Sequence, residues 1–392
     1  MTTSISAGRT PRTKARAEVV GSLLRPSGLR ELFPEVYEGQ TAPSRRLVSD
    51  DRKPLLEQLD RKADLAIAEV VQRQIDLGMD VVTDGELRRA GFMHSMVDAL
   101  GGTVDRGQTS SFSGRDGQVI DAPTVIMVGT ERLYKADNPA LQEVKYVQSL
   151  TDFPLKVTFP APSYWYAEPV DLEHRVYSDH HEFVREMMKI TRELVDEVIA
   201  AGVRYVQFDW PAYVMAIDPK FRDGVVGTEG QPLDQLIDSL VALDNEVLDG
   251  LPADVTTALH ICRGNYRSSW LTEGSLEPIA EQIFNQLAHD RLLIEWENQE
   301  REGDFSPLRF VPRGGPDIVM GVVSSKVPEI ETVDEVQALV EEAAEYVDIQ
   351  QLAVSPQCGF ASSWEGNTIA DEIQWRKLEV VGEVADRIWG TA

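Results

Sequence analysis

Short runs of β-branched residues alternate with longer amphipathic segments along most of this chain. This alternation is typical of βα units wound around a parallel sheet. We predict eight strands, over residues 17–24, 79–86, 155–162, 205–211, 256–263, 291–298, 317–324 and 351–356. We predict helices around residues 55–78, 181–201, 232–249, 275–288, 332–346 and 371–389. Eight such units predict an α/β fold of the (β/α)8 TIM-barrel type.

The chain has 392 residues, more than the roughly 250 that are typical of such a barrel. We assign the excess to an N-terminal helical extension and to an insertion at about residues 95–150. Inside the insertion, the stretch "GGTVDRGQTSSFSGRDGQVID" is rich in Gly and Ser and predicts a hairpin after the second strand. Residues 1–16 are expected to form a disordered, solvated tail, and residues 17–392 a single barrel domain.

Acidic residues dominate the charge of the chain, with 65 Asp and Glu against 38 Lys and Arg and a formal net charge of −27. Such a charge repels phosphate backbones and anionic lipid surfaces, so we expect neither nucleic acid nor a membrane as partner. No apolar run reaches the roughly 18 residues that span a bilayer. The basic N-terminus is not followed by the apolar stretch of a secretory signal. We therefore expect a cytoplasmic protein, in which the two cysteines stay reduced.

Polar residues interrupt the predicted strands near their C-terminal ends, where the active site of a (β/α)8 barrel is built. Because all eight ends meet at one rim, we expect these side chains to converge on one site. They are Ser22, Arg25, Asp84, Glu86, Asp209, His260, Cys262, Glu295, Glu297 and Cys358.

The stretch "TALHICRGN" places His260 and Cys262 on the same face of a predicted strand, because side chains alternate with period 2. Cys358 in "SPQCGF" adds a second sulfur, and Glu295 adds an oxygen. Zinc accepts these three kinds of ligand, and an open or exchangeable position would make the site catalytic. The alternative is that both cysteines are small buried residues and His260 a hydrogen-bonded core histidine. Spacing does not choose between Glu295 and Glu297 as ligand.

Glu86 and Asp209 are carboxylates in largely apolar surroundings, where a charge needs a cation or several N–H donors. The amino group of a substrate is one such cation, and a structural ion pair is the alternative. In the third loop, "PSYWY" supplies Tyr164, Trp165 and Tyr166, which either wall a substrate, Trp165 being our candidate, or pack in the core.

The motifs "VGSLLRP", "TDGELRR", "FDWPAY", "HICRGN", "IEWEN", "GVVSSKVPEIE" and "SPQCGF" resemble, in the same order, those of the cobalamin-independent methionine synthase family. The resemblance is to its short, single-barrel members and runs from about residue 18 to 390. It implies a catalytic zinc held by His260, Cys262, Glu295 and Cys358. It also implies that Glu86 and Asp209 hold the amino group of homocysteine, and that the turn containing Ser22 and Arg25 receives its carboxylate. Zinc would deprotonate the thiol, which then attacks a methyl group to form methionine.

Two departures from the family concern the methyl donor. Long members carry a second, N-terminal barrel that helps to bind polyglutamylated folate, and a chain of this length has no room for it. Many relatives also have a histidine after the seventh strand as the acid for the leaving group, where this chain has Ser325 and Lys326. Lys326, with Asp209, is our candidate catalytic residue. The donor is either a folate or a methylcorrinoid protein.

Four alternatives remain at this point, one of which is a thiol methyltransferase that does not form methionine. Epoxyalkane:coenzyme M transferases resemble the same barrel, and Arg25 or Arg263 would bind the sulfonate of their thiol. A non-catalytic, zinc-stabilised barrel would keep its metal sealed from solvent. A decarboxylase on a related barrel would need no metal. The insertion would either cover the site or pair with a second subunit in a homo-oligomer, and the sequence does not choose between these.

Overall fold

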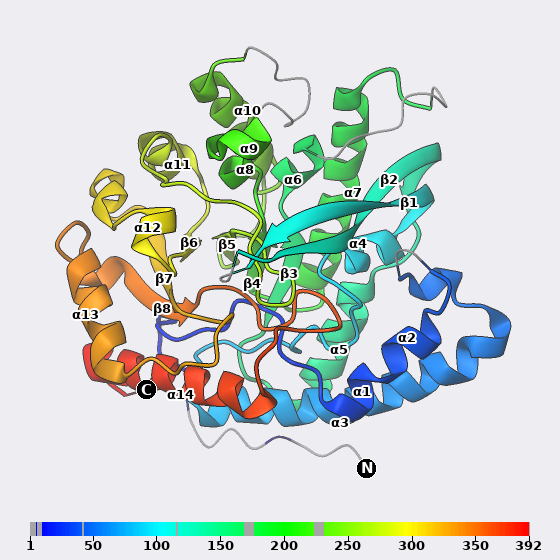
Figure 1. Cartoon of the computed structure of the whole chain (residues 1–392), viewed down its shortest axis with the longest axis horizontal. Coiled ribbons are helices and arrows are strands. Elements are labelled where there is room, and N and C mark those ends of the chain that lie inside the picture. Colours follow the sequence, from blue (N-terminus) through cyan, green and yellow to red (C-terminus); the bar gives the residue numbers. More distant parts are fainter. Residues whose placement is uncertain are drawn as a thin grey trace.

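Six parallel strands form one sheet in the order β3-β4-β5-β6-β7-β8, and helices surround it (Figure 1). The computed structural model describes residue 5 and residues 10–40, 43–114, 117–167, 176–222 and 231–391. The strands of the sheet are β3 (Lys156–Pro160), β4 (Tyr205–Asp209), β5 (Thr256–Ile261), β6 (Arg291–Glu295), β7 (Asp317–Val323) and β8 (Leu352–Pro356). Each corresponds to one of the last six predicted strands, so the βα periodicity identified them correctly.

The first two predicted strands close the barrel through single bridges rather than continuous ladders. Ala17 pairs with Val354 of β8, Glu18 pairs with Val81, and Val82 pairs with Leu155, all in parallel. The circle of eight segments is therefore complete, which confirms the (β/α)8 prediction. Residues 17–24 and 79–86 are not regular strands as predicted, since only the bridges at Ala17, Glu18, Val81 and Val82 link them to their neighbours. The second segment ends in a turn at Gly85 and Glu86, whose φ angles are +69° and +55°.

The longer helices cover the outside of the barrel, each with an apolar stripe turned inward. Capping side chains fix the N-termini of several of these helices. Asp179 caps α7 by accepting the Glu182 N–H at 2.8 Å, and Thr332 with Glu335 forms a capping box on α13. These helices are α3 (Lys53–Asp76), α5 (Pro139–Leu150), α7 (His180–Ala200), α10 (Leu233–Glu246), α11 (Ala280–Gln286), α13 (Val333–Ala343) and α14 (Asp371–Trp389).

Short helical turns carry the connections between these elements. The predicted N-terminal helical extension consists of α1 and α2 followed by two 3-10 turns that lead into α3. The short elements are α1 (Ser27–Arg30), α2 (Leu32–Val36), η1 (Arg45–Leu47), η2 (Asp50–Arg52), α4 (His94–Ala99), α6 (Pro162–Ala167), α8 (Tyr213–Ile217), α9 (Pro219–Arg222), α12 (Gln299–Glu302), η3 (Ser306–Phe310) and η4 (Ile349–Gln351).

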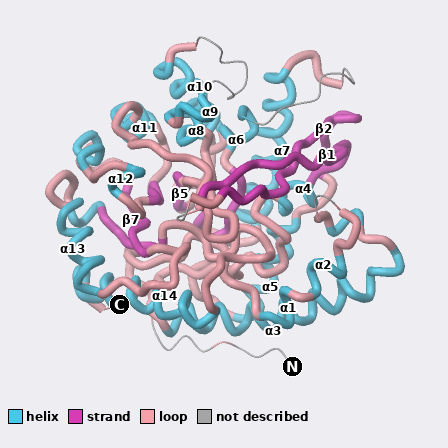
Figure 2. The backbone as a smooth tube through the Cα atoms, viewed as in Figure 1, coloured by secondary structure: helices cyan, strands magenta, loops and turns pink. Residues whose placement is uncertain are grey.

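The predicted hairpin is present as the antiparallel pair β1 (Leu100–Ser113) and β2 (Val119–Lys135), which project together from the barrel (Figure 2). The end of β1 meets the loop after β5, where Ser113 and Trp270 exchange backbone hydrogen bonds of 2.7 and 2.9 Å. Phe112 packs beside Tyr266, with ring centroids 5.7 Å apart. The hairpin therefore reaches over the C-terminal side of the barrel, while α5, at the end of the predicted insertion, belongs to the helical layer.

The expected solvated tail is wrong for residues 12–16. Arg12 binds Asp80 at 2.8 Å, Lys14 binds Asp317 at 2.5 Å, and the Arg16 N–H binds Asp80 at 2.8 Å. These cations lie against carboxylates at the N-terminal end of the barrel, so an ion-pair network holds the segment. Residues 1–4 and 6–9 of the predicted tail lie outside the described residues.

A buried ion cluster fills the N-terminal end of the barrel interior. The Glu18 carboxylate accepts bonds of 2.8 Å from Lys156, Arg291 and the Tyr205 hydroxyl. Burial raises the pKa of Glu18, but Lys156 and Arg291 outweigh it and lower the pKa to about 2. Next to this cluster an apolar layer packs in the barrel interior. The layer consists of Val20, Val81, Tyr205, Ala258, Leu293, Val319 and Ala353.

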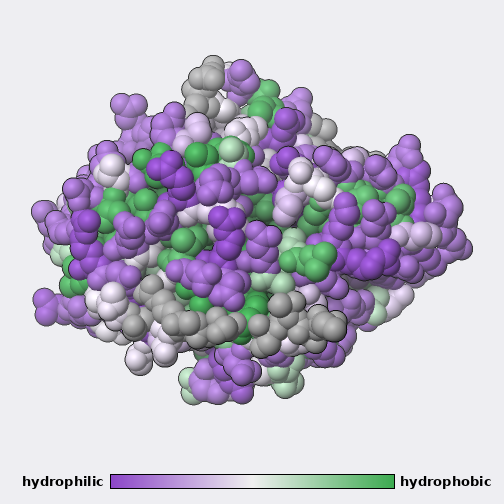
Figure 3. All heavy atoms as spheres, turned by 90° about the horizontal axis from the view of Figure 1, so that it is seen from below, coloured by the Kyte–Doolittle hydropathy of each residue, from purple (hydrophilic) through white to green (hydrophobic). Residues whose placement is uncertain are grey.

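Hydrophilic residues cover most of the face drawn in Figure 3, and apolar residues form small separate groups on it. None of the helices among the described residues combines the length and apolar composition that crossing a bilayer requires.

Candidate active site

His260, Cys262 and Cys358 meet at the C-terminal end of the barrel. His260 lies in β5 and Cys262 follows that strand directly, so both side chains point inward as their spacing predicted. Cys358 follows β8 by two residues. The ligand atoms of the three residues all lie within 4.8 Å of one another, and the two sulfur atoms are 3.4 Å apart. The three side chains are buried, and this grouping could hold a metal ion.

We call His260, Cys262 and Cys358 the triad. The surroundings of its donor atoms suit the binding of a metal cation. His260 Nδ1 lies 3.3 Å from the Leu293 carbonyl, while its buried Nε2 has no hydrogen-bond partner among the described residues. A histidine held at one nitrogen and open at the other is the usual state of a metal ligand. The Gly264 N–H donates to Cys262 Sγ at 3.2 Å. The contact with Cys262 lowers the pKa of the Cys358 thiol well below its ordinary value and raises that of Cys262.

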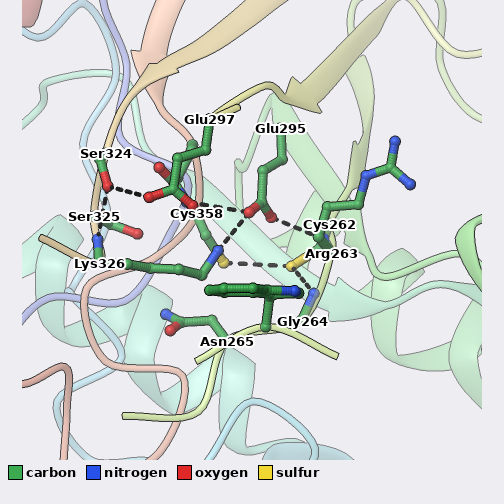
Figure 4. Close-up of polar contacts among 12 residues, drawn as sticks. Cys262, Arg263, Gly264, Asn265, Glu295, Glu297, Ser324, Ser325, Lys326 and Cys358 are labelled. Atoms are coloured by element: carbon green, nitrogen blue, oxygen red, sulfur yellow. Dashed lines mark hydrogen bonds and ion pairs between the residues drawn. The ribbon is translucent and has the colours of Figure 1, made fainter. Parts of the chain in front are cut away.

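Glu295, the predicted fourth ligand, is not part of this group. Its carboxylate accepts the Arg263 backbone N–H at 2.8 Å and the Gln357 side-chain N–H at 3.1 Å, and it forms a buried ion pair with Lys326 (Figure 4). Glu297 is bound instead by Ser324 at 3.0 Å and Arg301 at 2.7 Å. Of the two glutamates, Glu295 is the one turned toward the sulfur atoms (Figure 4), and its carboxylate is paired with the ammonium of Lys326.

A pocket of about 50 Å³ opens beside the triad. Predicted substrate residues Ser22, Glu86 and Asp209 line it together with the three candidate ligands. The full lining is Val20, Gly21, Ser22, Glu86, Phe92, Asp209, Trp210, His260, Cys262, Asn265, Cys358, Gly359 and Ser362. The pocket thus brings two carboxylates together with two sulfur atoms and an imidazole.

The two pocket carboxylates differ in their partners. Glu86 accepts the Thr158 hydroxyl at 2.7 Å and lies 3.5 Å from the Arg89 guanidinium. Asp209 accepts one bond of 2.6 Å from Gln207. Burial, against the influence of His260, raises the pKa of Asp209 to about 7. A cationic group in the pocket would offset the cost of this buried charge. The remaining acid of this loop, Asp84, faces away from the pocket and accepts the Glu86 N–H at 2.9 Å.

Arg25 does not face the pocket, contrary to the prediction that it binds substrate. Its guanidinium donates to the backbone carbonyls of Glu86 at 2.8 Å and Ser363 at 3.1 Å, and also to those of Arg89 and Ala361. The long side chain of Arg25 binds carbonyls of two neighbouring loops and so fixes the backbone that carries Glu86. The Arg263 guanidinium also points away from the sulfur atoms (Figure 4) and does not contribute to the described lining. Neither arginine is therefore placed to bind a sulfonate in this pocket.

Trp165 is fully buried and packs edge-on against Tyr164, with ring centroids 5.3 Å apart. It does not line the described pocket, and its burial favours the packing alternative. The aromatic wall comes from Phe92 and Trp210, whose stacked rings have centroids 6.1 Å apart. Trp210 has a φ of +57°, a conformation that costs energy for a bulky residue and turns its ring over the pocket.

Sequence reasoning missed Phe92, Trp210 and Asn265, which line the pocket, and Gln357, which binds Glu295 without lining it. Trp210, Asn265 and Gln357 stand inside the motifs "FDWPAY", "HICRGN" and "SPQCGF", where their nearness to candidate ligands was an available signal. Phe92 lies in a loop between elements, and no periodicity or spacing singled it out. Lys326, the candidate acid, is not among the described lining residues and is paired with Glu295.

Comparison with known proteins agrees with this geometry. The model of the cobalamin-independent synthase catalytic domain matches residues 33–372. The uncharacterized protein YxjH of Bacillus subtilis is 32% identical over 377 residues, which are 95% of this chain and 94% of that protein. A methionine synthase of Sulfolobus acidocaldarius is 25% identical over 343 residues, covering 87% of this chain and 84% of that protein.

The fold is likewise shared with a solved structure. A B12-independent methionine synthase from Shewanella sp., solved in complex with selenomethionine, superposes with a TM-score of 0.70 at 21% identity, over 95% of this chain and 97% of that one. The family match covers most of the chain and includes the strands that carry the triad. The chain therefore belongs to the family of the cobalamin-independent synthase catalytic domain, a methyltransferase family of the methionine synthase type.

Proposed function

We propose that this protein is a zinc-dependent S-methyltransferase that converts homocysteine to methionine. One observation carries the proposal, namely that the His260, Cys262 and Cys358 donor atoms share a pocket with the Glu86 and Asp209 carboxylates. The first set suits a metal that activates sulfur, and the second suits the amino group of an amino acid. Homocysteine offers both groups in one molecule.

Zinc fits the donor set because it accepts thiolate sulfur and imidazole nitrogen in one tetrahedral site. Bound there, zinc would lower the pKa of a thiol in its open position and provide a nucleophilic sulfur at neutral pH. The orphaned Nε2 of His260 and the N–H that Gly264 donates to Cys262 support this assignment. Two thiolates would balance the charge of a divalent ion, so the buried site would carry little net charge.

The chain's own residues bind and orient the amino acid. Glu86 and Asp209 would receive its ammonium group, which keeps Asp209 charged despite burial. Ser22, whose Oγ accepts the Ala361 N–H at 3.3 Å, lies on the same wall, and we assign the substrate carboxylate to this turn. Phe92 and Trp210 would exclude water from the reacting sulfur, which strengthens these charge interactions.

The methyl donor enters from the open side of the pocket. We propose a donor whose leaving group needs no proton from this chain, such as a methylcorrinoid protein, in preference to a free methylfolate. The support is that Lys326, our candidate acid in the loop after β7, is paired with Glu295 and is absent from the described lining.

Metal analysis combined with thiol titration tests the proposal. Purified protein should contain one equivalent of zinc. In the cobalt-substituted protein, homocysteine should change the visible absorption of the metal at about one equivalent. Absence of bound zinc, or a cobalt spectrum that homocysteine leaves unchanged, would contradict the assignment.

A further inference from the structure

The Arg89 guanidinium lies between two buried carboxylates, those of Glu86 and Glu143. Its Nε and Nη2 donate to the Glu143 carboxylate at 3.0 and 2.6 Å, whereas its Nη1 lies 3.5 Å from Glu86 Oε1. Nη1 donates instead to the Thr158 hydroxyl at 2.8 Å, and that hydroxyl donates to Glu86 Oε1 at 2.7 Å. Arg89 therefore binds Glu143 directly and is linked to Glu86 through Thr158.

These charged groups are buried together. Glu86, Arg89 and Glu143 expose 4%, 6% and 6% of their surfaces. With Asp84 they line a cavity of about 10 Å³, which shares Glu86 with the substrate pocket. Little water screens charges in such a place, so each acts strongly on its neighbours. Burial lowers the pKa of Arg89, but Glu143, then Glu86 and, more weakly, Asp84 outweigh burial and raise that pKa. Arg89 thus stays charged, with Glu143 as its main partner.

The other cations near this cavity have partners of their own. Arg25 donates to the backbone carbonyl of Glu86 at 2.8 Å and to further backbone carbonyls. Lys156, which also lines the cavity, donates to Glu18 at 2.8 Å. Among the described cations, Arg89 is therefore the one that can close on the Glu86 carboxylate.

A carboxylate binds a substrate ammonium well only if no cation of the protein already neutralises it. Without the charge of Glu143, the Arg89 guanidinium would be free to form a hydrogen-bonded ion pair with Glu86, which their 3.5 Å separation does not allow. That pair would neutralise Glu86 and bring a positive charge toward the pocket, where it would repel an ammonium. Glu143 binds the guanidinium through two nitrogens, the geometry in which arginine and carboxylate pair best.

We propose that Glu143, on α5, is a positioning residue that makes the pocket selective for a thiol bearing an amino group, because it holds Arg89 away from Glu86. The charge of Glu86 is then available to the substrate ammonium. The inference rests on the proposed function, in which Glu86 receives that ammonium. It extends the site to a residue of the outer helical layer that does not line the described pocket.

The binding of two thiols that differ only in the amino group tests the proposal. Homocysteine and 4-mercaptobutanoate are titrated into the cobalt-substituted protein, and the visible absorption of the metal reports binding. Glu143→Gln should lower the affinity for homocysteine about tenfold and change that for 4-mercaptobutanoate by less than about twofold. Metal content should stay as in the wild type. Asp80→Asn is the matched control, because Asp80 is also buried and binds an arginine, Arg12, through both oxygens at 3.0 and 2.8 Å.

A double variant separates the charge of Arg89 from the loss of Glu143. In Arg89→Met with Glu143→Gln, no guanidinium can close on Glu86, while Thr158 still binds it. This variant should therefore bind homocysteine with nearly the affinity of the wild type. It removes one charge of each sign from the interior, so it provides a test even if Glu143→Gln alone does not fold. A double variant that has lost the preference for homocysteine would overturn the inference.

The remaining outcomes distinguish the inference from the proposed function. If Glu143→Gln keeps the wild-type ratio of the two affinities, or weakens both thiols equally, Glu143 has only a structural role and the inference is overturned while the proposed function stands. If the wild type itself binds the two thiols equally, the ammonium site is wrong, and both the proposed amino-acid substrate and the inference are overturned.

Discussion

The sulfur atoms of Cys262 and Cys358 lie 3.4 Å apart, although 96 positions separate the two residues in the chain. They come from the ends of β5 and β8, which barrel closure brings to one rim. Two buried sulfur atoms at this distance, beside an imidazole nitrogen without a partner among the described residues, form a donor set that suits a metal cation.

Removing one donor should therefore empty the metal site. We expect Cys262→Ser, Cys358→Ser and His260→Gln each to lower zinc content sharply, because a neutral hydroxyl or amide is a poor replacement for thiolate or imidazole. Zinc per chain is measured by elemental analysis after gel filtration. His289→Gln is the control, since His289 is a buried histidine outside the triad. Full zinc occupancy in both serine variants would disprove the assignment.

Asp209 should select for the amino group of the thiol. Asp209→Asn is expected to weaken homocysteine by about 3–5 kcal/mol, because an ammonium would be left in the pocket without its carboxylate. A thiol of similar length that lacks the amine should lose much less affinity. Calorimetry on the zinc-loaded protein measures both. Asp244→Asn is the matched control, since Asp244 is buried but bound to Ser163 at 2.7 Å outside the pocket. Equal losses for the two thiols would favour a substrate without an ammonium group.

Gly21 provides space for Glu86. A Cβ added at Gly21 would lie 2.6 Å from Glu86 Oε1, so Gly21→Ala should displace that carboxylate. We expect homocysteine affinity to fall by about 1–2 kcal/mol while zinc content is unchanged. Gly28→Ala serves as control, because the nearest atom to its added Cβ is the flexible end of Lys62 at 3.4 Å. Unchanged homocysteine affinity in Gly21→Ala would remove Glu86 from the binding site.

The ion cluster around Glu18 should make the free energy of unfolding depend on pH in the acidic range. The pKa of Glu18 is lowered from 4.5 to about 2 by Lys156 and Arg291 against the effect of burial. The stabilisation is thus complete above pH 4.5 and is lost as the pH falls toward 2, a change of about 3 kcal/mol. Urea unfolding at pH 7 and pH 3 should show that Glu18→Gln is destabilised at pH 7 and loses less than the wild type on acidification. Glu69→Gln, at an exposed position, should follow the wild type.

The methyl donor should be one whose leaving group departs without being protonated by a general acid. Protonation by a general acid is worth about 10²–10⁴-fold in rate, and in this chain the ammonium of Lys326 is paired with Glu295. We expect slow methionine formation from methyltetrahydrofolate, with one or several glutamates, and faster formation from methylcobalamin. Rapid turnover with the folate that Lys326→Met retains would show that the proton comes from another group.

The sequence alone determined the barrel and the triad. Period-2 spacing put His260 and Cys262 on one face, and the order of βα units put Cys358 on the same rim, because strand ends in a barrel converge whatever the details of packing. The family motifs pointed to Ser22, Glu86 and Asp209, and the structure places all three on the pocket wall.

Only the tertiary structure determined which groups the longer side chains contact. Arg25 reached backbone carbonyls of two loops, Trp165 packed into the core, and Lys326 paired with Glu295. Periodicity tells which face of a strand a residue occupies, but a long side chain from a loop can turn to several partners. The choice among them depends on which buried charge or carbonyl is otherwise unsatisfied, and those groups come from segments far apart in the chain.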